Sequence, residues 1–218
     1  PPSPVLVRTV VTTDLADHIA AHYGIAVTEV LTGFKYIGEV IGRLEAEGRA
    51  GDFLFGFEES YGYLGGSYVR DKDGVYGAFI IAEMCAAARA AGLTLTERLA
   101  QLYHTYGYAK NSLRSYTLSG AAGLEKMRMV MAHFRTGVKS IGPSRVQDVT
   151  DYLSPDTGLP PSDVLKFRLA DASTVVIRPS GTEPKLKVYI SVRADGEEKA
   201  AEKESALAES ISSVILQI

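Results

Sequence analysis

The sequence predicts an α/β domain with a mixed sheet, followed by an α+β domain, and three observations lead to this fold class. Strand-like and helix-like segments alternate through the first half of the chain. The second half instead contains mostly strand-like runs, accompanied by a few helical segments. The change of pattern falls near the stretch TYGYAKN. We therefore predict two domains, at residues 1–108 and 109–218.

Composition indicates a globular chain that can bury a core. Of its 218 residues, 46% are apolar and 22% are charged, which is ordinary for a folded protein. The formal net charge of −3 argues against broad binding to nucleic acid or anionic membranes. No run approaches the roughly 20 apolar residues of a membrane span, and the start lacks a signal-peptide pattern. We expect a cytoplasmic protein with neither a nucleic-acid nor a membrane partner.

The first half is expected to form alternating strands and helices. Apolar and β-branched runs predict strands at 5–11, 26–31 and 52–57, and helical spacing predicts helices at 14–24, 35–48, 74–92 and 94–107. Thr94 or Thr96 is the candidate N-cap of the last of these helices. The helix 74–92 is apolar nearly all round, so we predict that it is buried between layers. The single cysteine, Cys85, permits no intramolecular disulfide and is expected to be buried in this helix.

The second half is expected to form a sheet of several strands that helices cover. The predicted strands are 110–118, 146–153, 164–170, 173–179 and 185–194. A helix at 123–135 places five apolar side chains on one face, namely Leu124, Met127, Val130, Met131 and Phe134. A charged helix closes the chain, and its apolar stripe contains Leu207, Ile211, Val214 and Ile218. This arrangement is typical of an α+β domain.

The hairpin tip RPSGTEPK contains more charged and hydrogen-bonding groups than a turn requires. Backbone amides around Ser180, Gly181 and Thr182 can converge on one anion, and the glycine allows close approach and an unusual φ. The two hydroxyl groups add donors, and Arg178 supplies a planar fork that matches phosphate oxygens. A rigid turn with a surface arginine is the alternative. The combination favours a phosphate-binding loop.

A second polar cluster follows the predicted strand 52–57, in the stretch FGFEESYGYLGGSYVRDKDG. Two adjacent carboxylates, Glu58 and Glu59, precede the hydroxyl of Ser60, and a loop after an apolar strand can present them to a ligand. Carboxylates beside a hydroxyl suit a sugar. A general acid/base pair is less favoured, because adjacent residues usually point apart. A solvated turn is the remaining alternative.

Two weaker signals lie on either side of this cluster. Asp71 and Asp73 are spaced like the first ligands of a calcium loop, but the later ligand positions do not match. We therefore interpret RDKDG as a turn, with Lys72 as a possible phosphate-binding or proton-transfer group. Thr32 and Gly33 lie between a strand and the start of a helix, where free amides favour anions.

Several common catalytic motifs are absent. His18 and His22 have the spacing of zinc ligands, but no third ligand with a nearby motif accompanies them, so we predict no metal site in this chain. The sequence contains no Walker A loop, no dinucleotide-binding glycine motif and no nucleophile elbow. A cluster of three aspartates for magnesium is also missing.

Taken together, the motifs TGFKYIGE, GFEESYGYLGGSYVRDKDG and RPSGTEPKLKVY resemble those of the α-D-phosphohexomutase family, the phosphoglucomutases and phosphomannomutases. The match runs over nearly the whole chain, in the family's order and spacing. In that family four domains surround one deep cleft, and this chain resembles the third and fourth. The resemblance implies that the first domain here binds sugar. It also implies that the second has a TATA-binding-protein-like fold and binds phosphate.

The resemblance also implies roles for individual residues. Thr32, Gly33, Glu58 and Ser60 match sugar-binding positions, and Arg178, Ser180, Gly181, Thr182 and Lys187 match the phosphate-binding site. Lys72 matches a lysine implicated in substrate contact and proton transfer, which makes it the catalytic candidate of this chain. The family's more common loop has a histidine where this chain has Gly62, a departure that resembles the glucose-preferring branch.

The activity implied for the intact family interconverts a hexose 1-phosphate and a hexose 6-phosphate through a bisphosphate and a phosphoserine. This chain contains neither the family's phosphoserine loop nor its magnesium loop. We therefore expect Mg²⁺ and a hexose 1,6-bisphosphate activator for the full-length enzyme only, and no turnover by this chain alone. Because position 1 is not Met, we expect N-terminal domains of the same polypeptide as partners, besides a phosphorylated hexose. A stand-alone phosphosugar-binding or regulatory module is the alternative.

Overall fold

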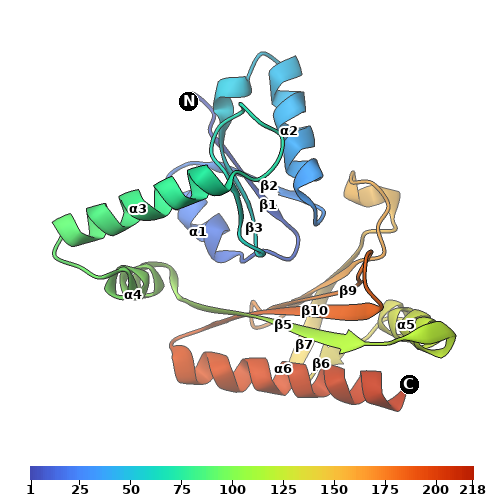
Figure 1. The fold of residues 1–218 in the computed structure, drawn as a ribbon. Helices are drawn as coiled ribbons and strands as arrows, with labels where there is room; N and C mark the ends of the chain where they lie inside the picture. The colour runs from blue at the N-terminus through green and yellow to red at the C-terminus, as the bar shows by residue number, and fades with distance from the viewer. The chain divides into compact units, whose positions relative to one another are not determined.

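Two units make up the chain, Pro1–Tyr106 and Gly107–Ile218, and the computed structural model describes all residues from 1 to 218. Figure 1 shows their helices and strands, coloured from the N-terminus to the C-terminus. The first unit holds a mixed sheet with helices, and the second holds an antiparallel sheet with helices. The predicted fold class, an α/β domain followed by an α+β domain, is confirmed.

Unit 1 is built on a four-stranded sheet in the order β2-β1-β3-β4. Its strands are β1 (Val5–Thr9), β2 (Ala26–Val30), β3 (Phe53–Glu58) and β4 (Gly62–Leu64); its helices are α1 (Leu15–His22), α2 (Phe34–Ala46), α3 (Gly74–Ala90) and α4 (Leu95–Tyr106), with a 3-10 turn at Ala50–Asp52. β1 pairs in parallel with β2 and β3, whereas β4 is antiparallel to β3. The short strand β4 was not predicted from the sequence.

Helix α2 closes one face of this sheet. The core beneath it consists of Val5, Val7, Val30, Phe34, Ile37, Val40, Ile41, Leu44, Phe53 and Leu64. A glycine is required at position 56, because a Cβ there would lie 2.5 Å from Ile37 Cγ2. The α2 face is therefore fully buried.

The opposite face of the same sheet is only partly covered. Side chains alternate along strands, and five partly buried apolar residues lie on this face, namely Leu6, Val27, Phe55, Phe57 and Tyr63. The short helix α1 is tied to the sheet by Arg8, whose guanidinium donates to Asp17 and, at 2.7 Å, to Glu29 Oε2. The eight residues of α1 are too few to cover the whole face.

Helix α3 is not buried between layers, and that prediction is wrong. Figure 1 shows α3 extending away from the sheet of its own unit. Only Gly77 and Ala88 are buried, whereas Val75 is 82% exposed and Phe79 is 57% exposed. Cys85, which was expected to be buried, is exposed as well. The apolar composition of α3 therefore belongs to a surface that unit 1 does not cover by itself.

Helix α4 begins at the predicted Thr94 cap. The Glu97 amide donates to Thr94 Oγ1 at 3.2 Å, and the Thr94 amide donates to Glu97 Oε2 at 2.7 Å.

None of the helices is by itself long and apolar enough to cross a membrane. Helices α3 and α4 meet the length and composition criteria only as a pair that is bent by 86° at the break.

Unit 2 is built on a six-stranded antiparallel sheet in the order β5-β10-β9-β8-β7-β6. Its strands are β5 (Tyr108–Thr117), β6 (Ser140–Ile141), β7 (Ser144–Asp151), β8 (Leu165–Leu169), β9 (Thr174–Pro179) and β10 (Lys185–Ala194); its helices are α5 (Gly120–Arg135) and α6 (Glu197–Gln217), with a 3-10 turn at Pro155–Thr157. All five predicted strands form. The two-residue strand β6 was missed because it is too short to show a periodic pattern.

Helices α5 and α6 pack against the same face of this sheet. The core contains Met127, Val130, Met131 and Phe134 of α5, and Leu207, Ile211 and Ile215 of α6, against strand residues such as Phe167, Ile177 and Val188. Leu124 was predicted on the buried face of α5, but its side chain is 50% exposed. Because strand residues alternate, the opposite face of the sheet carries Arg178, Lys187 and Tyr189.

A buried carboxylate links α6 to the edge strand β5. Because of it, we expect the free energy of unfolding of unit 2 to depend on pH. Glu204 Oε1 accepts hydrogen bonds from Ser112 Oγ at 2.6 Å and Arg114 Nη2 at 2.7 Å. Burial would raise the pKa of Glu204, but these hydrogen bonds outweigh burial and lower it below the ordinary value of 4.5. The ionised carboxylate therefore stabilises unit 2 above that pH, and this contribution is lost as the pH falls further.

We expect Glu204→Gln to flatten the loss of stability of unit 2 below about pH 4.5, measured by urea unfolding at several pH values. Glu202→Gln, at an exposed position of the same helix, is the control and should keep the slope of the native protein. A slope that Glu204→Gln leaves unchanged would contradict the assignment.

Candidate functional site

The first cluster of predicted site residues lies where β3 ends and α2 begins. Glu58 is the last residue of β3, and Gly33 is the N-cap of α2. Gly33 has a φ of +127°, a conformation that residues with a side chain rarely adopt. Its amide donates to Glu58 Oε1 at 2.8 Å, and Glu58 is only 7% exposed. The fold thus joins two predicted residues that lie 25 positions apart in the sequence.

Thr32 adds a polar atom to this cluster. Its Oγ1 is buried and has no hydrogen-bond partner, which is uncommon for a buried hydroxyl group. Thr32 directly precedes the N-cap of α2, where the positive end of the helix dipole favours negative charge. The cluster therefore combines an unused hydroxyl, a helix N-terminus and a buried carboxylate.

The turn between β3 and β4 separates the two adjacent glutamates. Glu58 is buried, whereas Glu59 and Ser60 are exposed, so the two carboxylates do not share one environment. Gly62 packs closely beside them, because a Cβ there would lie 3.2 Å from the ring of Phe34 and 3.3 Å from Glu58 Oε2. A larger residue at position 62 would require Phe34 or Glu58 to move.

Lys72 reaches the same cluster from the loop between β4 and α3. Its Nζ lies 5.7 Å from the centroid of the Phe34 ring and 2.9 Å from Asp71 Oδ1. Phe34 is the residue that sequence reasoning missed, and its position directly after Gly33 was the available signal. The structure therefore places Lys72 Nζ and Gly62 near the same aromatic ring, that of Phe34. Ser60 forms no hydrogen bond to this cluster.

Asp73 fixes the loop that precedes α3. Its Oδ1 accepts from the amides of Val75 at 2.8 Å and Tyr76 at 3.1 Å, and its Oδ2 accepts from the Tyr68 hydroxyl at 2.6 Å. The hydrogen bond to Asp73 raises the pKa of Tyr68 to about 12, because the phenolate would lie beside a carboxylate. A turn was predicted for RDKDG; the role of Asp73 as the N-cap of α3 was not.

We expect Asp73→Ala to lower the pKa of Tyr68 toward its ordinary value of 10.0, since the acceptor and its charge are removed. The pKa can be followed by NMR of the tyrosine ring carbons, with Tyr68→Phe used to assign the signal. Asp71→Ala removes a nearby carboxylate that does not bond Tyr68 and serves as the control. A pKa that stays near 12 in Asp73→Ala would contradict the assigned cause.

The second cluster lies on the β9–β10 hairpin, in the interior of the six-stranded sheet. Arg178 of β9 and Lys187 of β10 are direct cross-strand partners. Neither side chain forms an ion pair, and Nε of Arg178 is buried without a hydrogen-bond partner. The guanidinium carbon of Arg178 lies 5.9 Å from the centroid of the Tyr189 ring, a contact that was not predicted. Two adjacent cations, neither of which forms an ion pair with a carboxylate, give a surface that favours an anion.

The tip of this hairpin differs in two respects from the prediction. The Ser180 amide donates to the Lys185 carbonyl at 2.8 Å, so it closes the hairpin and cannot bind an anion. The amides of Gly181 and Thr182 have no acceptor within the chain. Gly181 does not adopt a positive φ, and a Cβ there would meet nothing within 4 Å. This glycine therefore leaves the approach to the tip open rather than providing an unusual conformation.

Two further contacts hold the tip in place. Pro184 accepts a hydrogen bond through its carbonyl from the Leu118 amide at 2.8 Å. Glu183 Oε1 accepts from Lys185 Nζ at 2.7 Å, and this hydrogen bond lowers the pKa of Glu183. Lys185 thus forms the direct ion pair with Glu183, whereas the charge of Lys187 acts on Glu183 without a hydrogen bond.

No group of three or more His, Cys, Asp or Glu side chains could hold a metal ion in this structure. His22 packs its ring edge-on against Tyr23 and Tyr106, with centroid distances of 5.0 and 5.7 Å. The histidine pair noted in the sequence is therefore not brought together with further ligands.

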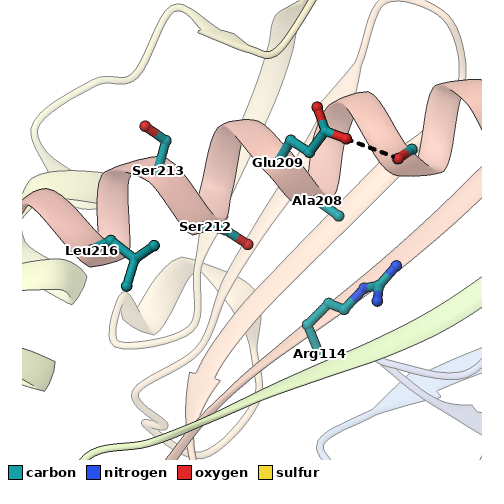
Figure 2. A pocket seen from close by; sticks show the side chains of 7 residues that line it. Arg114, Ala208, Glu209, Ser212, Ser213 and Leu216 are labelled. Atoms are coloured by element: carbon teal, nitrogen blue, oxygen red, sulfur yellow. Dashed lines mark hydrogen bonds between the residues drawn. The ribbon is translucent and has the colours of Figure 1, made fainter.

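A cavity of about 520 Å³ lies between β5 and α6; Figure 2 shows side chains that line it. It is lined by Arg114, Ser205, Ala208, Glu209, Ser212, Ser213 and Leu216. The dashed line marks the hydrogen bond from Ser205 Oγ to Glu209 Oε1, at 3.1 Å. None of the predicted site residues lines this cavity, so it is separate from both clusters.

Comparison with known proteins places this chain in a family. A family model described as phosphoglucomutase/phosphomannomutase, alpha/beta/alpha domain III, matches residues 1–106. A second model, described as the C-terminal domain of the same family, matches residues 126–209. The chain therefore belongs to the phosphoglucomutase/phosphomannomutase family and contains its domain III and its C-terminal domain.

Curated relatives agree with this assignment. Phosphoglucomutases from Staphylococcus aureus strains MSSA476 and MW2 are each 33% identical over 215 residues, which covers 93% of this chain. The chain spans only 38% of the length of these relatives.

Solved structures support the fold. The phosphoglucomutase pp63/parafusin from Paramecium, in its open form, matches with a TM-score of 0.65 and 24% identity, over 96% of this chain and 37% of that protein. A phosphoglucomutase/phosphomannomutase family protein from Burkholderia thailandensis matches with a TM-score of 0.58 and 14% identity, over 97% of this chain and 38% of that protein.

Proposed function

We propose that this chain is the substrate-binding part of a phosphohexomutase that interconverts hexose 1-phosphate and hexose 6-phosphate. The observation that carries the proposal is the cross-strand pair of Arg178 and Lys187, which forms no ion pair beside two amides without acceptors. Such a tip recognises the charge and the tetrahedral shape of a phosphate group more than the part of the sugar to which the phosphate is attached. It can therefore bind either phosphate of a hexose bisphosphate.

Unit 1 would supply the sugar contacts. Glu58 uses Oε1 to hold the Gly33 amide, and its second oxygen can accept from a sugar hydroxyl. The hydroxyls of Thr32 and Ser60 can donate to the same sugar or accept from it. Lys72 Nζ lies over the Phe34 ring and can bind an anionic oxygen or move a proton there. The membership of the chain in the phosphoglucomutase/phosphomannomutase family supports the proposal that unit 1 contacts a sugar.

The phosphoryl donor and the magnesium ion would come from the remainder of the polypeptide. A bound Mg²⁺ would neutralise charge on the phosphoryl group during transfer, but this chain brings no three suitable ligands together. A hexose 1,6-bisphosphate would serve as activator of the complete enzyme. The chain by itself is proposed to bind phosphosugar without turnover.

The proposal can be tested by an NMR amide titration with glucose 1-phosphate, glucose 1,6-bisphosphate and inorganic phosphate. We expect shifts at residues 56–62 and 178–187, larger for the bisphosphate than for phosphate. Glu58→Gln keeps the shape of the side chain and should remove the response at 56–62 alone. Equal shifts for all three ligands, confined to 178–187, would contradict the sugar contacts, and no shifts at either segment would contradict the whole proposal.

A further inference from the structure

The hairpin turn between β3 and β4 contains a residue with an unusual backbone conformation. Glu58 and Gly62 are the cross-strand pair that closes this hairpin, so its loop consists of Glu59, Ser60 and Tyr61. Three-residue hairpin loops commonly end in a left-handed residue, and glycine is the usual residue at that position. Tyr61 occupies this position with a φ of +63°. A tyrosine therefore lies where the backbone favours a glycine.

The rest of the chain follows the usual preference for glycine. Every other positive φ belongs to a glycine, apart from that of Ala172, whose side chain is a single methyl group. A residue with a Cβ loses stability in this conformation, whereas glycine does not. Residues that keep such conformations cluster at ligand-binding sites. The conformation of Tyr61 therefore points to a role in binding.

The side chain of Tyr61 does not offset this loss of stability through contacts of its own. It is 85% exposed, so most of its ring lies in water. It forms no hydrogen bond, ion pair or ring contact with another residue of the chain. The fold of these 218 residues thus gives no reason for a tyrosine at this position.

The same loop carries two residues that are proposed to bind the sugar. Glu58 ends β3, and Ser60 directly precedes Tyr61. A pyranose has hydroxyl groups around its rim and apolar C–H groups on its two faces. Carboxylates and hydroxyls bind the rim, whereas an aromatic ring packs against a face. The loop therefore offers both kinds of group that a cyclic sugar requires.

We propose that the ring of Tyr61 stacks against an apolar face of the hexose whose hydroxyl groups contact Glu58 and Ser60. This inference rests on the proposed function and adds a binding residue that selects for a cyclic sugar. A stacked ring requires no fixed pattern of hydroxyl groups, so the contact is compatible with a hexose that is held by either of its phosphates. An acyclic polyol phosphate has the hydroxyl groups but no rigid face, and it would lack the contact.

Tyr61→Gly separates binding from folding. Because glycine suits a φ of +63°, we expect the Tm of the variant to equal or exceed that of the native chain. The Kd of glucose 6-phosphate should rise about three- to tenfold, as expected for the loss of one aromatic contact. The Kd of glucitol 6-phosphate, which is acyclic, should change by less than about 1.5-fold. Thermal unfolding followed by circular dichroism and NMR titration of the amides of residues 56–62 would give these values.

Two further variants serve as controls. Tyr61→Phe keeps the ring and should preserve the native ratio of the two Kd values, because the stacking does not need the hydroxyl group. Tyr23→Gly removes another exposed tyrosine, which is 64% exposed at the end of α1, and should change neither Kd.

The outcomes distinguish this inference from the proposed function. Intermolecular NOEs between the ring protons of Tyr61 and the C–H protons of glucose 6-phosphate would support the stacking directly. If glucose 6-phosphate shifts residues 56–62 with the same Kd in the native chain and in Tyr61→Gly, the stacking is overturned and the other sugar contacts stand. If the native chain responds at 178–187 but not at 56–62, the sugar contacts of unit 1 and the stacking fail together. A lower Tm in Tyr61→Gly with an unchanged ratio of the two Kd values would assign Tyr61 to the fold alone and overturn the inference.

Discussion

Replacing Arg178 with alanine is expected to weaken the binding of a hexose phosphate by about 1.5–3 kcal/mol, or about 10- to 150-fold in Kd. The guanidinium lies beside Lys187, forms no ion pair and presents a buried Nε without a partner. A phosphate at the hairpin tip would receive charge-assisted hydrogen bonds from it, which are stronger than neutral ones. Isothermal titration calorimetry with glucose 1,6-bisphosphate would measure the change.

The control for this substitution lies on the same sheet. Arg168 of β8 is already paired with Asp148, at 3.3 Å, and its side chain is mostly exposed. Arg168→Ala should therefore leave the affinity within about twofold of the native value, because its charge is neutralised and screened. If Arg178→Ala and Arg168→Ala have the same small effect, the hairpin does not hold the phosphate.

Replacing Phe167 with alanine is expected to destabilise unit 2 by about 3–5 kcal/mol. This side chain is fully buried among the core residues of the sheet and of α5. Its ring packs edge-on against Phe134, with a centroid distance of 5.9 Å, so both apolar burial and an aromatic contact are lost. Urea unfolding followed by NMR signals of unit 2 would measure the change, while the signals of unit 1 report whether the other unit is affected.

Two further variants would make this measurement specific. Phe167→Leu keeps most of the volume and should cost much less than the alanine variant. Leu153→Ala, at a site that is 47% exposed, should stay within about 0.5 kcal/mol of the native protein. A loss below about 1.5 kcal/mol in Phe167→Ala would mean that the core of unit 2 closes around the cavity, contrary to the close packing described here.

Most of the fold could be predicted from local patterns, because caps, turns and strand alternation depend on residues that are close together in the sequence. The Thr94 cap, the strands around the RPSGTEPK hairpin and the alternation along β10 are all fixed by short stretches. The burial of α3 could not be predicted in the same way. An apolar helix indicates that something covers it, but the pattern does not say whether the cover lies within the same 218 residues.

The candidate site was predicted as separate residues, and the contacts between them were not. Gly33 and Glu58 were each proposed as ligand contacts, but the hydrogen bond between them depends on how β3 and α2 meet. The hairpin tip was predicted to offer three amides, whereas Ser180 uses its own to close the turn. Backbone pairing at a hairpin end depends on register, which residue types alone do not determine.

The pairing of Arg178 with Lys187 also has a consequence for how the protein behaves in different buffers. Like charges on directly opposed strand residues repel each other, so in the absence of an anion they weaken the β9–β10 ladder near its hairpin end. A bound phosphate removes this repulsion as well as adding its own contacts, and salt screens both effects. The measured stability of unit 2 in phosphate buffer is then partly a measure of ligand binding, whereas in Tris it describes the polypeptide alone.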